Sequence, residues 1–162
     1  MLIAPHVAVG AAIGLEINNP YLVVILAIIS HFVLDMIPHY DSGTIHYNEK
    51  KLVLDWRDWL LITFDIILAG VIFWFFYRGS DFSFNVFLGA AVSFGVDLID
   101  KVFQIEIKNK KIAFANDRKI PVISAMNKFH EKANYNLNPK YWYWGVLTQI
   151  IVTGGSIICL IK

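Results

Sequence analysis

Histidines and aspartates with the spacing of one helix face stand together in the sequence SHFVLDMIPHYD. His31 and Asp35 are four residues apart and His39 is four further on, so a continuous helix would place all three on one face. Pro38 disfavours helix in the residue before it, so we expect the chain to turn and bring His39 and Asp41 back over the helix end. Imidazole and carboxylate together suit Zn²⁺, Mn²⁺ or Fe²⁺ as ligands. The segment therefore predicts part of a metal site.

Four more acidic or histidine residues lie inside apolar stretches, namely His6, Asp65, Asp97 and Asp100. Such a side chain within a membrane span costs at least ~2.5 kcal/mol on insertion scales, so each one needs a partner or a function. At ~1.5 Å of rise per helical residue, His31, Asp65 and Asp97 each lie roughly 10 Å into the membrane from the same side. Because of this shared depth we predict one or two divalent cations, zinc before manganese or iron, with these metal ligands: His6, His31, Asp35, His39, Asp65 and Asp97.

The elements that position these residues are predicted to be membrane-spanning helices. The chain has 162 residues, of which 57% are hydrophobic and 17% charged, and its mean hydropathy is +0.55. A bilayer core needs about 20 apolar residues in a helix to cross it. We expect an all-α membrane protein with a single domain over 1–162, and a bundle of about five helices at residues 2–17, 20–37, 58–77, 84–104 and 141–161. The first helix is short and rich in Gly and Ala, which favours close packing inside a bundle, and it either spans or is re-entrant.

Basic residues predict the orientation. The loops at 39–58 and 105–140 lie on one side, because two spans separate them, and together they carry most of the lysines and arginines. The positive-inside rule makes both loops cytoplasmic, with the N-terminus inside and the C-terminus outside a cell's inner membrane. The partners expected are therefore membrane lipids, including anionic head groups at the basic loop. A net charge of +1 gives no reason to expect nucleic acid, and nothing in the sequence specifies an oligomeric state.

The segment 105–140 is the part with room for extramembrane structure. Its start, IEIKNKKIAF, alternates like a strand, and residues 121–134 have the pattern of a helix that lies along the membrane surface. That helix carries His130, which is either a surface histidine or a residue that reaches over the metal site. His46 lies in a polar loop and is expected at the surface. Cys159 is the single cysteine, which excludes a cysteine-based metal site within one chain.

The segments APHVAVGAAIGL and SHFVLDMIPHYD resemble a bacterial and archaeal family of membrane-bound metal-dependent hydrolases. Members of that family have an early histidine followed by the pattern H-x3-D-x2-P-[HD]-x-D. The positions that match here are His6, His31, Asp35, Pro38, His39 and Asp41. The resemblance covers about the first 41 residues. It implies a multi-pass membrane protein with a metal site and hydrolase activity.

The leading functional prediction is a metal-dependent hydrolase at the cytoplasmic membrane interface, acting on a phosphoester or other ester of a membrane lipid. Asp41 or His130 would serve as the general acid or base. One alternative is a transport or proton-relay subunit, since intramembrane acids and histidines also mark ion paths. Another is a non-catalytic structural subunit whose polar cluster joins helices by hydrogen bonds. In that case Asp97 would simply pair with Lys101, one turn further on.

Overall fold

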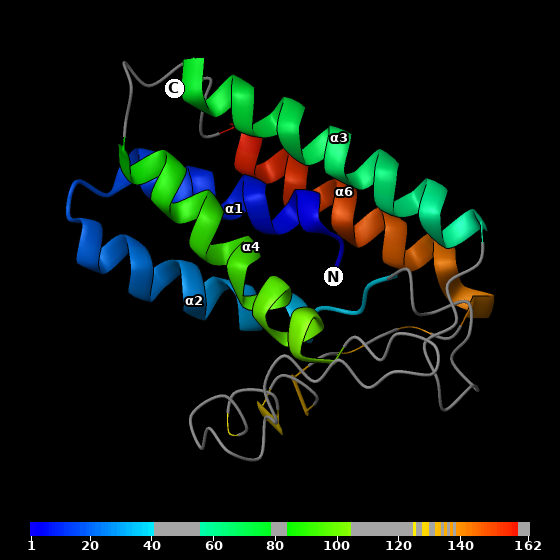
Figure 1. Ribbon diagram of the computed structural model, residues 1–162. Helices are drawn as coiled ribbons and strands as arrows, with labels where there is room; N and C mark the ends of the chain where they lie inside the picture. The colour runs from blue at the N-terminus through cyan, green and yellow to red at the C-terminus, as the bar shows by residue number, and fades with distance from the viewer. Residues whose placement is uncertain are drawn as a thin grey trace.

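All the regular elements in the described part of the chain are helices, which confirms the predicted all-α class for that part (Figure 1). The computed structural model describes residues 1–40, 56–78, 84–104 and 139–158, with a few positions between 125 and 137, and the side chains of the third range only as far as 99. The elements are α1 (Ile3–Glu16), α2 (Pro20–Met36), α3 (Trp56–Arg78), α4 (Phe84–Gln104), the 3₁₀ turn η3 (Pro139–Tyr141) and α6 (Trp142–Ile158).

Helix α1 is the centre of the bundle. It packs against α2, α3, α4 and α6, and most extensively against α4. Figure 1 shows the long helices side by side. Helices α1, α3 and α6 run in one direction, and α2 and α4 run in the opposite direction. The N-terminal end of α1 therefore lies at the same end of the bundle as the C-terminal ends of α2 and α4. This arrangement brings residues far apart in the sequence to one level.

Glycines let α1 and α4 meet backbone to backbone. A Cβ atom on Gly10 would contact the carbonyl oxygen of Gly89, and one on Gly89 would contact the carbonyl oxygen of Gly10. One turn further along, a Cβ on Gly14 would contact the carbonyl oxygen of Asn85. Small residues at four-residue spacing allow such close helix approach. Most of α1 is buried, as expected for a helix that is apolar nearly all round, and the tight contact with α4 contributes to this burial.

Both ends of α1 are held by side chains from other helices. At its start, Asp65 of α3 accepts hydrogen bonds from the backbone N–H groups of Ile3 and Ala4, at 2.6 and 3.0 Å. At its end, the Asn85 side-chain amide donates to the carbonyl oxygen of Ile17 at 2.8 Å. The first N–H and last C=O groups of a helix have no partner within the helix, so a buried helix needs such bonds.

Local sequence signals set the bounds of α2. Asn19 is its N-cap, with Oδ1 accepting from the backbone N–H of Tyr21 at 3.0 Å, and Pro20 occupies the first turn. The helix ends at Met36, two residues before Pro38, as the restriction on the residue preceding proline predicts. This ending places Asp35 in the last turn and His39 beyond it.

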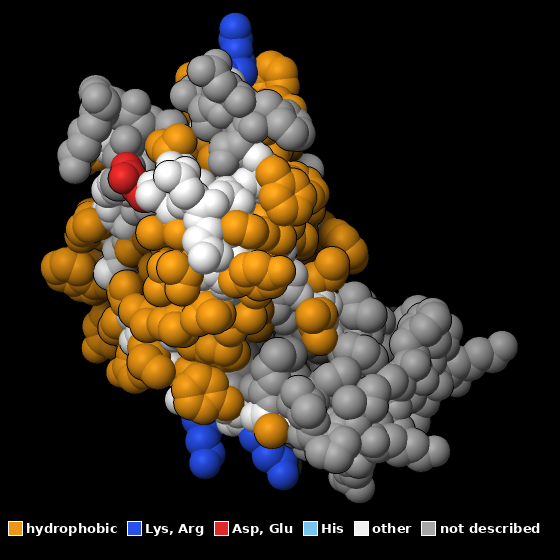
Figure 2. Space-filling model, turned by 90° about the vertical axis from the view of Figure 1, so that its left-hand side faces the viewer, with side chains coloured by type: hydrophobic (Ala, Val, Ile, Leu, Met, Phe, Trp, Pro, Cys, Tyr) orange, Lys and Arg blue, Asp and Glu red, His pale blue; other side chains and the backbone are white. Residues whose placement is uncertain are grey.

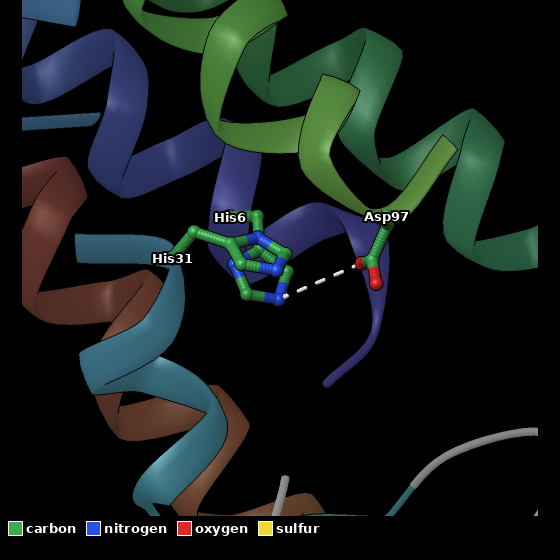
Figure 3. Close-up of side chains that lie close together, drawn as sticks. All are labelled: His6, His31 and Asp97. Carbon is green, nitrogen blue, oxygen red and sulfur yellow. Dashed lines mark ion pairs between the residues drawn. The ribbon is translucent and has the colours of Figure 1, made fainter. Parts of the chain in front are cut away.

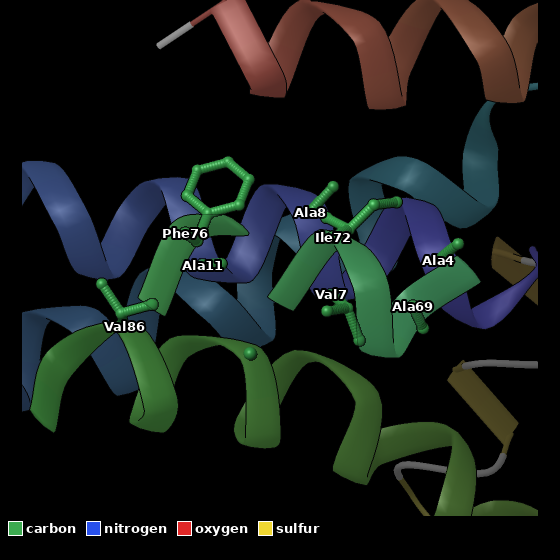
Figure 4. Packing of buried hydrophobic residues seen from close by; sticks show 9 residues of the cluster. Ala4, Val7, Ala8, Ala11, Ala69, Ile72, Phe76 and Val86 are labelled. Atoms are coloured by element: carbon green, nitrogen blue, oxygen red, sulfur yellow. The ribbon is translucent and has the colours of Figure 1, made fainter. Parts of the chain in front are cut away.

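The apolar core lies where α1 meets α3 and α4 (Figure 4). Its buried members are three alanines and a valine on α1 and a mixture of small and large residues on α3 and α4; they are Ala4, Val7, Ala8, Ala11, Ala69, Ile72, Phe76, Val86 and Ala90. Elsewhere large apolar side chains point outward, and hydrophobic groups cover most of the face seen in Figure 2.

The expectation of five spans goes beyond what helix length supports. Among the described helices, only α3, from Trp59 to Arg78, is both long and apolar enough to cross a membrane. Helices α1 and α2 and the segment Phe84–Ile99 of α4 are apolar but shorter. The strand-like pattern at 105–114 lies outside the described residues. Within the expected helix at 121–134, the described positions 125, 128–129 and 132–133 are helical.

Candidate metal centre

Imidazole and carboxylate groups from three helices converge at the buried start of α1. His6 comes from α1, His31 and Asp35 come from α2, and Asp97 comes from α4, and all four side chains are buried. One ligand atom each from His6, His31 and Asp97 lies within 4.8 Å of the other two (Figure 3). These three residues form the one group of potential metal ligands in the described part of the chain.

The ring of His31 is oriented by a bond to the backbone of α4. Its Nδ1 lies 2.8 Å from the carbonyl oxygen of Ser93. A carbonyl oxygen only accepts hydrogen bonds, so Nδ1 carries the proton and Nε2 is the nitrogen that faces the cluster. This bond is the usual second partner of a histidine that binds a metal through Nε2. The rings of His31 and His6 stack, with their centroids 4.3 Å apart and their planes 26° apart.

Asp35 lies between the two imidazoles. Its Oδ1 is 3.3 Å from His6 Nε2, and its Oδ2 is 3.2 Å from His31 Nε2. The α-amino nitrogen of Met1 donates to the same Oδ1 at 2.8 Å. His6 Nε2 also lies 3.8 Å from Asp97 Oδ2. The Nε2 of His6 can donate its own N–H to Asp35. The Nε2 of His31 faces Asp35 with a lone pair, because the proton of that ring is on Nδ1, so this contact requires either a second proton on the ring or a shared cation.

Two buried polar groups at this place have no hydrogen-bond partner among the described residues. The Nδ1 of His6 and the hydroxyl of Ser93 make no hydrogen bond to a described residue, whereas His6 Nε2 lies 3.3 Å from Asp35 Oδ1. A buried polar group without such a bond costs about 1 to 3 kcal/mol. The set of two imidazoles and two carboxylates fits the coordination preferences of zinc, manganese or iron better than those of calcium or magnesium.

Asp65 caps the start of α1, beside the cluster. Both of its oxygens accept backbone N–H groups of the first turn of α1, those of Ile3 and Ala4. The structure therefore does not bring Asp65 into the group of His6, His31 and Asp97, although the membrane depth counted from the sequence places it at the level of His31 and Asp97. Its position follows from α1, whose first N–H groups are buried and need an acceptor. A carboxylate at a helix N-terminus also interacts favourably with the helix dipole.

His39 is buried but is not part of that group either. Its Nδ1 lies 2.8 Å from the carbonyl oxygen of Ile37. Its backbone pairs with a later segment, since its N–H donates to Tyr135 at 3.3 Å and its C=O accepts from Leu137 at 2.9 Å. Of the six predicted ligands, the structure thus brings together His6, His31, Asp35 and Asp97.

Other residues singled out from the sequence lie outside the described residues. These include Asp41 and His130, so their roles as general acid or base stay predictions. The same holds for His46 and for the side chain of Lys101, the alternative partner of Asp97.

Gln149 of α6 is a buried polar residue that the sequence reading missed. Its Oε1 accepts from the N–H of Leu2 at 3.2 Å, and its Nε2 donates to the carbonyl oxygens of Tyr40 at 2.8 Å and Gly145 at 3.0 Å. It thereby joins the start of α1 to the segment after α2, the two places that flank the cluster. An amide inside an otherwise apolar run was the signal that would have found it.

Comparisons with known proteins do not assign the chain to a family. No family model, no curated protein and no solved structure matches it. The resemblance of the first part of the chain to membrane-bound hydrolases therefore rests on its motif alone.

Proposed function

We propose that this chain is a membrane-embedded, metal-dependent hydrolase that acts at the cytoplasmic interface on a phosphoester or other ester of a membrane lipid. The observation that supports this proposal is the convergence of His6, His31 and Asp97, with Asp35 beside them, from three helices at one buried point. Groups that are costly to bury are gathered there instead of being dispersed. The ligand chemistry fits one divalent cation, and the full set of expected ligands would allow a second.

The distribution of polar and apolar side chains supports a membrane location. Large apolar residues are exposed on the outer faces of several helices, among them Ile29 on α2, Phe64 on α3 and Ile150 on α6, while the acids and histidines of the cluster are buried. A soluble monomer rarely exposes apolar patches of such extent. Exposed tryptophans at Trp59 and Trp142 mark the ends of α3 and α6 nearest the candidate metal centre, as in an aromatic belt at the membrane surface.

Among the described helices only α3 is both long and apolar enough to cross a bilayer, and we propose that the shorter helices lie within the bilayer beside it. At ~1.5 Å per residue, the 23 residues of α3 extend over about 35 Å and the 17 residues of α2 and of α6 over about 26 Å. Helix α1, with 14 residues, is the shortest. Its length does not have to match the thickness of the bilayer core, because the other helices surround it.

The chain's own residues would hold and orient the reacting groups. His6, His31, Asp35 and Asp97 would bind the cation, and the bond from His31 to Ser93 would hold that ring in place. A divalent cation bound there would supply a Lewis acid and activate a water molecule. In the hydrolysis, the oxygen of the water bonds to the phosphorus or carbonyl carbon of the ester, and the ester oxygen leaves with a proton. Asp41 or His130 would transfer that proton.

Metal content and lipid hydrolysis test the proposal together. The wild-type chain, purified in detergent with zinc, manganese or iron supplied, should carry at least one ion per chain by elemental analysis. Asp97→Asn, which keeps the shape but removes the charge, should lose that ion. The matched control is Glu16→Gln, which changes an exposed acid at the far end of α1. Zinc-dependent ester cleavage in phospholipid vesicles, followed by lipid mass spectrometry, should follow the metal content.

A structural role for the cluster is the alternative, and its complete burial is the observation that favours it. His6, His31 and Asp35 are fully buried, and Asp35 already binds an ammonium group from Met1. In this case the polar contacts only join α1 to α2 and α4. Wild-type protein without any bound metal would support this alternative and overturn the hydrolase proposal.

The orientation is tested separately. A reporter fused after residue 162 should be active if it is alkaline phosphatase, which works outside the cytoplasmic membrane, and dark if it is green fluorescent protein. The opposite pattern would move the candidate metal centre to the outer side.

A further inference from the structure

A groove with purely apolar walls runs between α3 and α4 over the surface of α1. It has a volume of about 350 Å³, and side chains from all three helices line it, including Ile3, Val7, Gly70, Phe87 and Phe94. None of its ten lining residues is polar. An occupant that needs hydrogen bonds would therefore be excluded, and a hydrocarbon would be accepted.

The groove continues along the helices toward the far end of the bundle. A second hollow shares Phe73 and Phe87 with it and is closed by Trp74, Tyr77 and Phe84. From Ile66 to Tyr77 the two hollows follow α3 for ~16 Å, which is about half of a bilayer core of ~30 Å. The length thus corresponds to one hydrocarbon chain in one leaflet.

The groove is open, and small residues form part of its lining, namely Ala69, Gly70, Ala90 and Ala91. A Cβ atom on Gly70 would meet no atom within 4 Å. Ile66 and Phe87 on its two rims are 54% and 53% exposed, so the groove opens directly onto the apolar outer surface. A hydrocarbon chain would therefore enter sideways from the lipid without crossing a polar layer.

Two residues that line the groove lie one helical turn from cluster residues. Ile3 precedes His6 by three residues on α1, and Phe94 precedes Asp97 by three residues on α4. Residues three apart on a helix lie one above the other on the same face. A linear amphiphile with its tail in the groove and its polar end beside Ile3 and Phe94 would therefore place that end about one helical turn from His6 and Asp97.

The chemistry of the groove favours a hydrocarbon chain over a polar occupant. All ten of its lining residues are apolar, and its main part has a volume of about 350 Å³. A helix of a second copy could lie across such an open groove, so self-association is one outcome of the test below.

We propose that the groove between α3 and α4 binds one hydrocarbon chain of a membrane lipid and directs the ester of that lipid toward His6, His31 and Asp97. This inference rests on the proposed hydrolase function, because it names the part of the substrate that the enzyme holds. It makes the substrate an amphiphile with at least one linear chain, and it makes α3 a substrate-binding helix.

Photolabelling tests the groove directly. The full chain is reconstituted in vesicles of phosphatidylglycerol whose acyl chain carries a diazirine, the vesicles are irradiated, and the labelled residues are mapped by mass spectrometry. Labels should concentrate on the groove residues of α3 and α4. Gly70→Leu and, independently, Ala91→Leu fill the groove and should abolish that excess. The matched control Gly154→Leu adds the same side chain to α6, where a Cβ would also meet nothing within 4 Å, and should leave the labelling unchanged.

Each result has a defined meaning. Labels spread evenly over the outer faces of α2, α3 and α6, or labels that survive both groove-filling substitutions, would overturn the groove proposal. Crosslinks between two chains through the groove would overturn it in favour of self-association. Metal content, measured on the same samples, separates the two proposals. Wild-type protein that lacks metal but shows groove labelling would overturn the hydrolase proposal and leave the groove as a lipid-binding site.

Discussion

His31 donates its Nδ1 proton to the backbone carbonyl oxygen of Ser93, 2.8 Å away across the contact between α2 and α4. Ser93 lies one turn before Asp97 on α4, so the same helix turn that holds the ring also carries a carboxylate of the cluster. The bond therefore sets both which nitrogen of His31 faces the cluster and where that nitrogen lies relative to Asp97. Such a preorganised imidazole is what a metal ligand requires.

Replacing His31 with phenylalanine should weaken metal binding while leaving the helices packed. Phenylalanine keeps a flat ring in the stack with His6 but lacks both ring nitrogens. The affinity for zinc should fall by more than about tenfold, as it does even for changes beside the metal ligands. Competition with a chromophoric chelator in detergent measures this affinity. Unchanged zinc binding in His31→Phe, with Glu16→Gln as the control, would remove His31 from the site.

Asp65 should affect stability and not metal content. Asp65→Ala removes both acceptors of the first N–H groups of α1, so we expect a loss of about 2 kcal/mol of folding free energy. Asp65→Asn keeps one carbonyl oxygen and should lose less. Thermal unfolding in detergent and elemental analysis give the two readouts. A variant that folds as stably as wild type but has lost its metal would show that Asp65 is a ligand, as the sequence alone suggested.

The contrast between Asp65 and the other acids shows what the depth of a residue along its predicted helix can and cannot predict. Similar depth on helices of alternating direction predicted that His31, Asp65 and Asp97 would lie at one level. His31 and Asp97 do lie together, whereas Asp65 caps the first turn of α1. Depth does not determine which way a helix is rotated about its axis. Asp65 occupies its position because the first N–H groups of the buried helix α1 need an acceptor. A hydropathy pattern does not reveal this need.

Helix bounds were the easiest feature to predict, and neutral polar residues were the hardest. Pro20 and Pro38 bracket α2 through backbone rules that need no tertiary context. Gln149 carries no charge, so its burial costs less and leaves a weaker signal in the sequence. Its importance appears only when its backbone partner on another segment is known. The bond from His31 to α4 goes to the backbone carbonyl oxygen of Ser93, a group that every residue has, so the residue type does not reveal it.

The glycine contact between α1 and α4 should couple packing to metal binding. A Cβ on Gly10 would meet the backbone of Gly89 and lie 2.8 Å from Ser93 Cβ, so Gly10→Ala should force the two helices apart at a cost of about 1 to 3 kcal/mol. Because His6 and Asp97 lie on these helices, zinc affinity should fall as well. Gly154→Ala meets no neighbour and should be neutral or stabilising. Equal unfolding temperatures for the two variants would contradict the close approach.

Gln149→Leu should loosen the start of α1 without touching the metal ligands themselves. Leucine has a similar size but leaves the N–H of Leu2 and the carbonyl oxygen of Tyr40 without the amide that now joins them. Loss of these buried bonds should cost about 1 to 3 kcal/mol. Since Met1, on the same segment, contacts Asp35, the zinc affinity should fall measurably, but less than in His31→Phe.

Ser156→Ala is the control, because the hydroxyl of Ser156 bonds only to Val152 in its own helix among the described residues. Thermal unfolding and chelator competition on the two variants give the answer, and a Gln149→Leu protein as stable as Ser156→Ala would show that α1 is positioned by its other contacts alone.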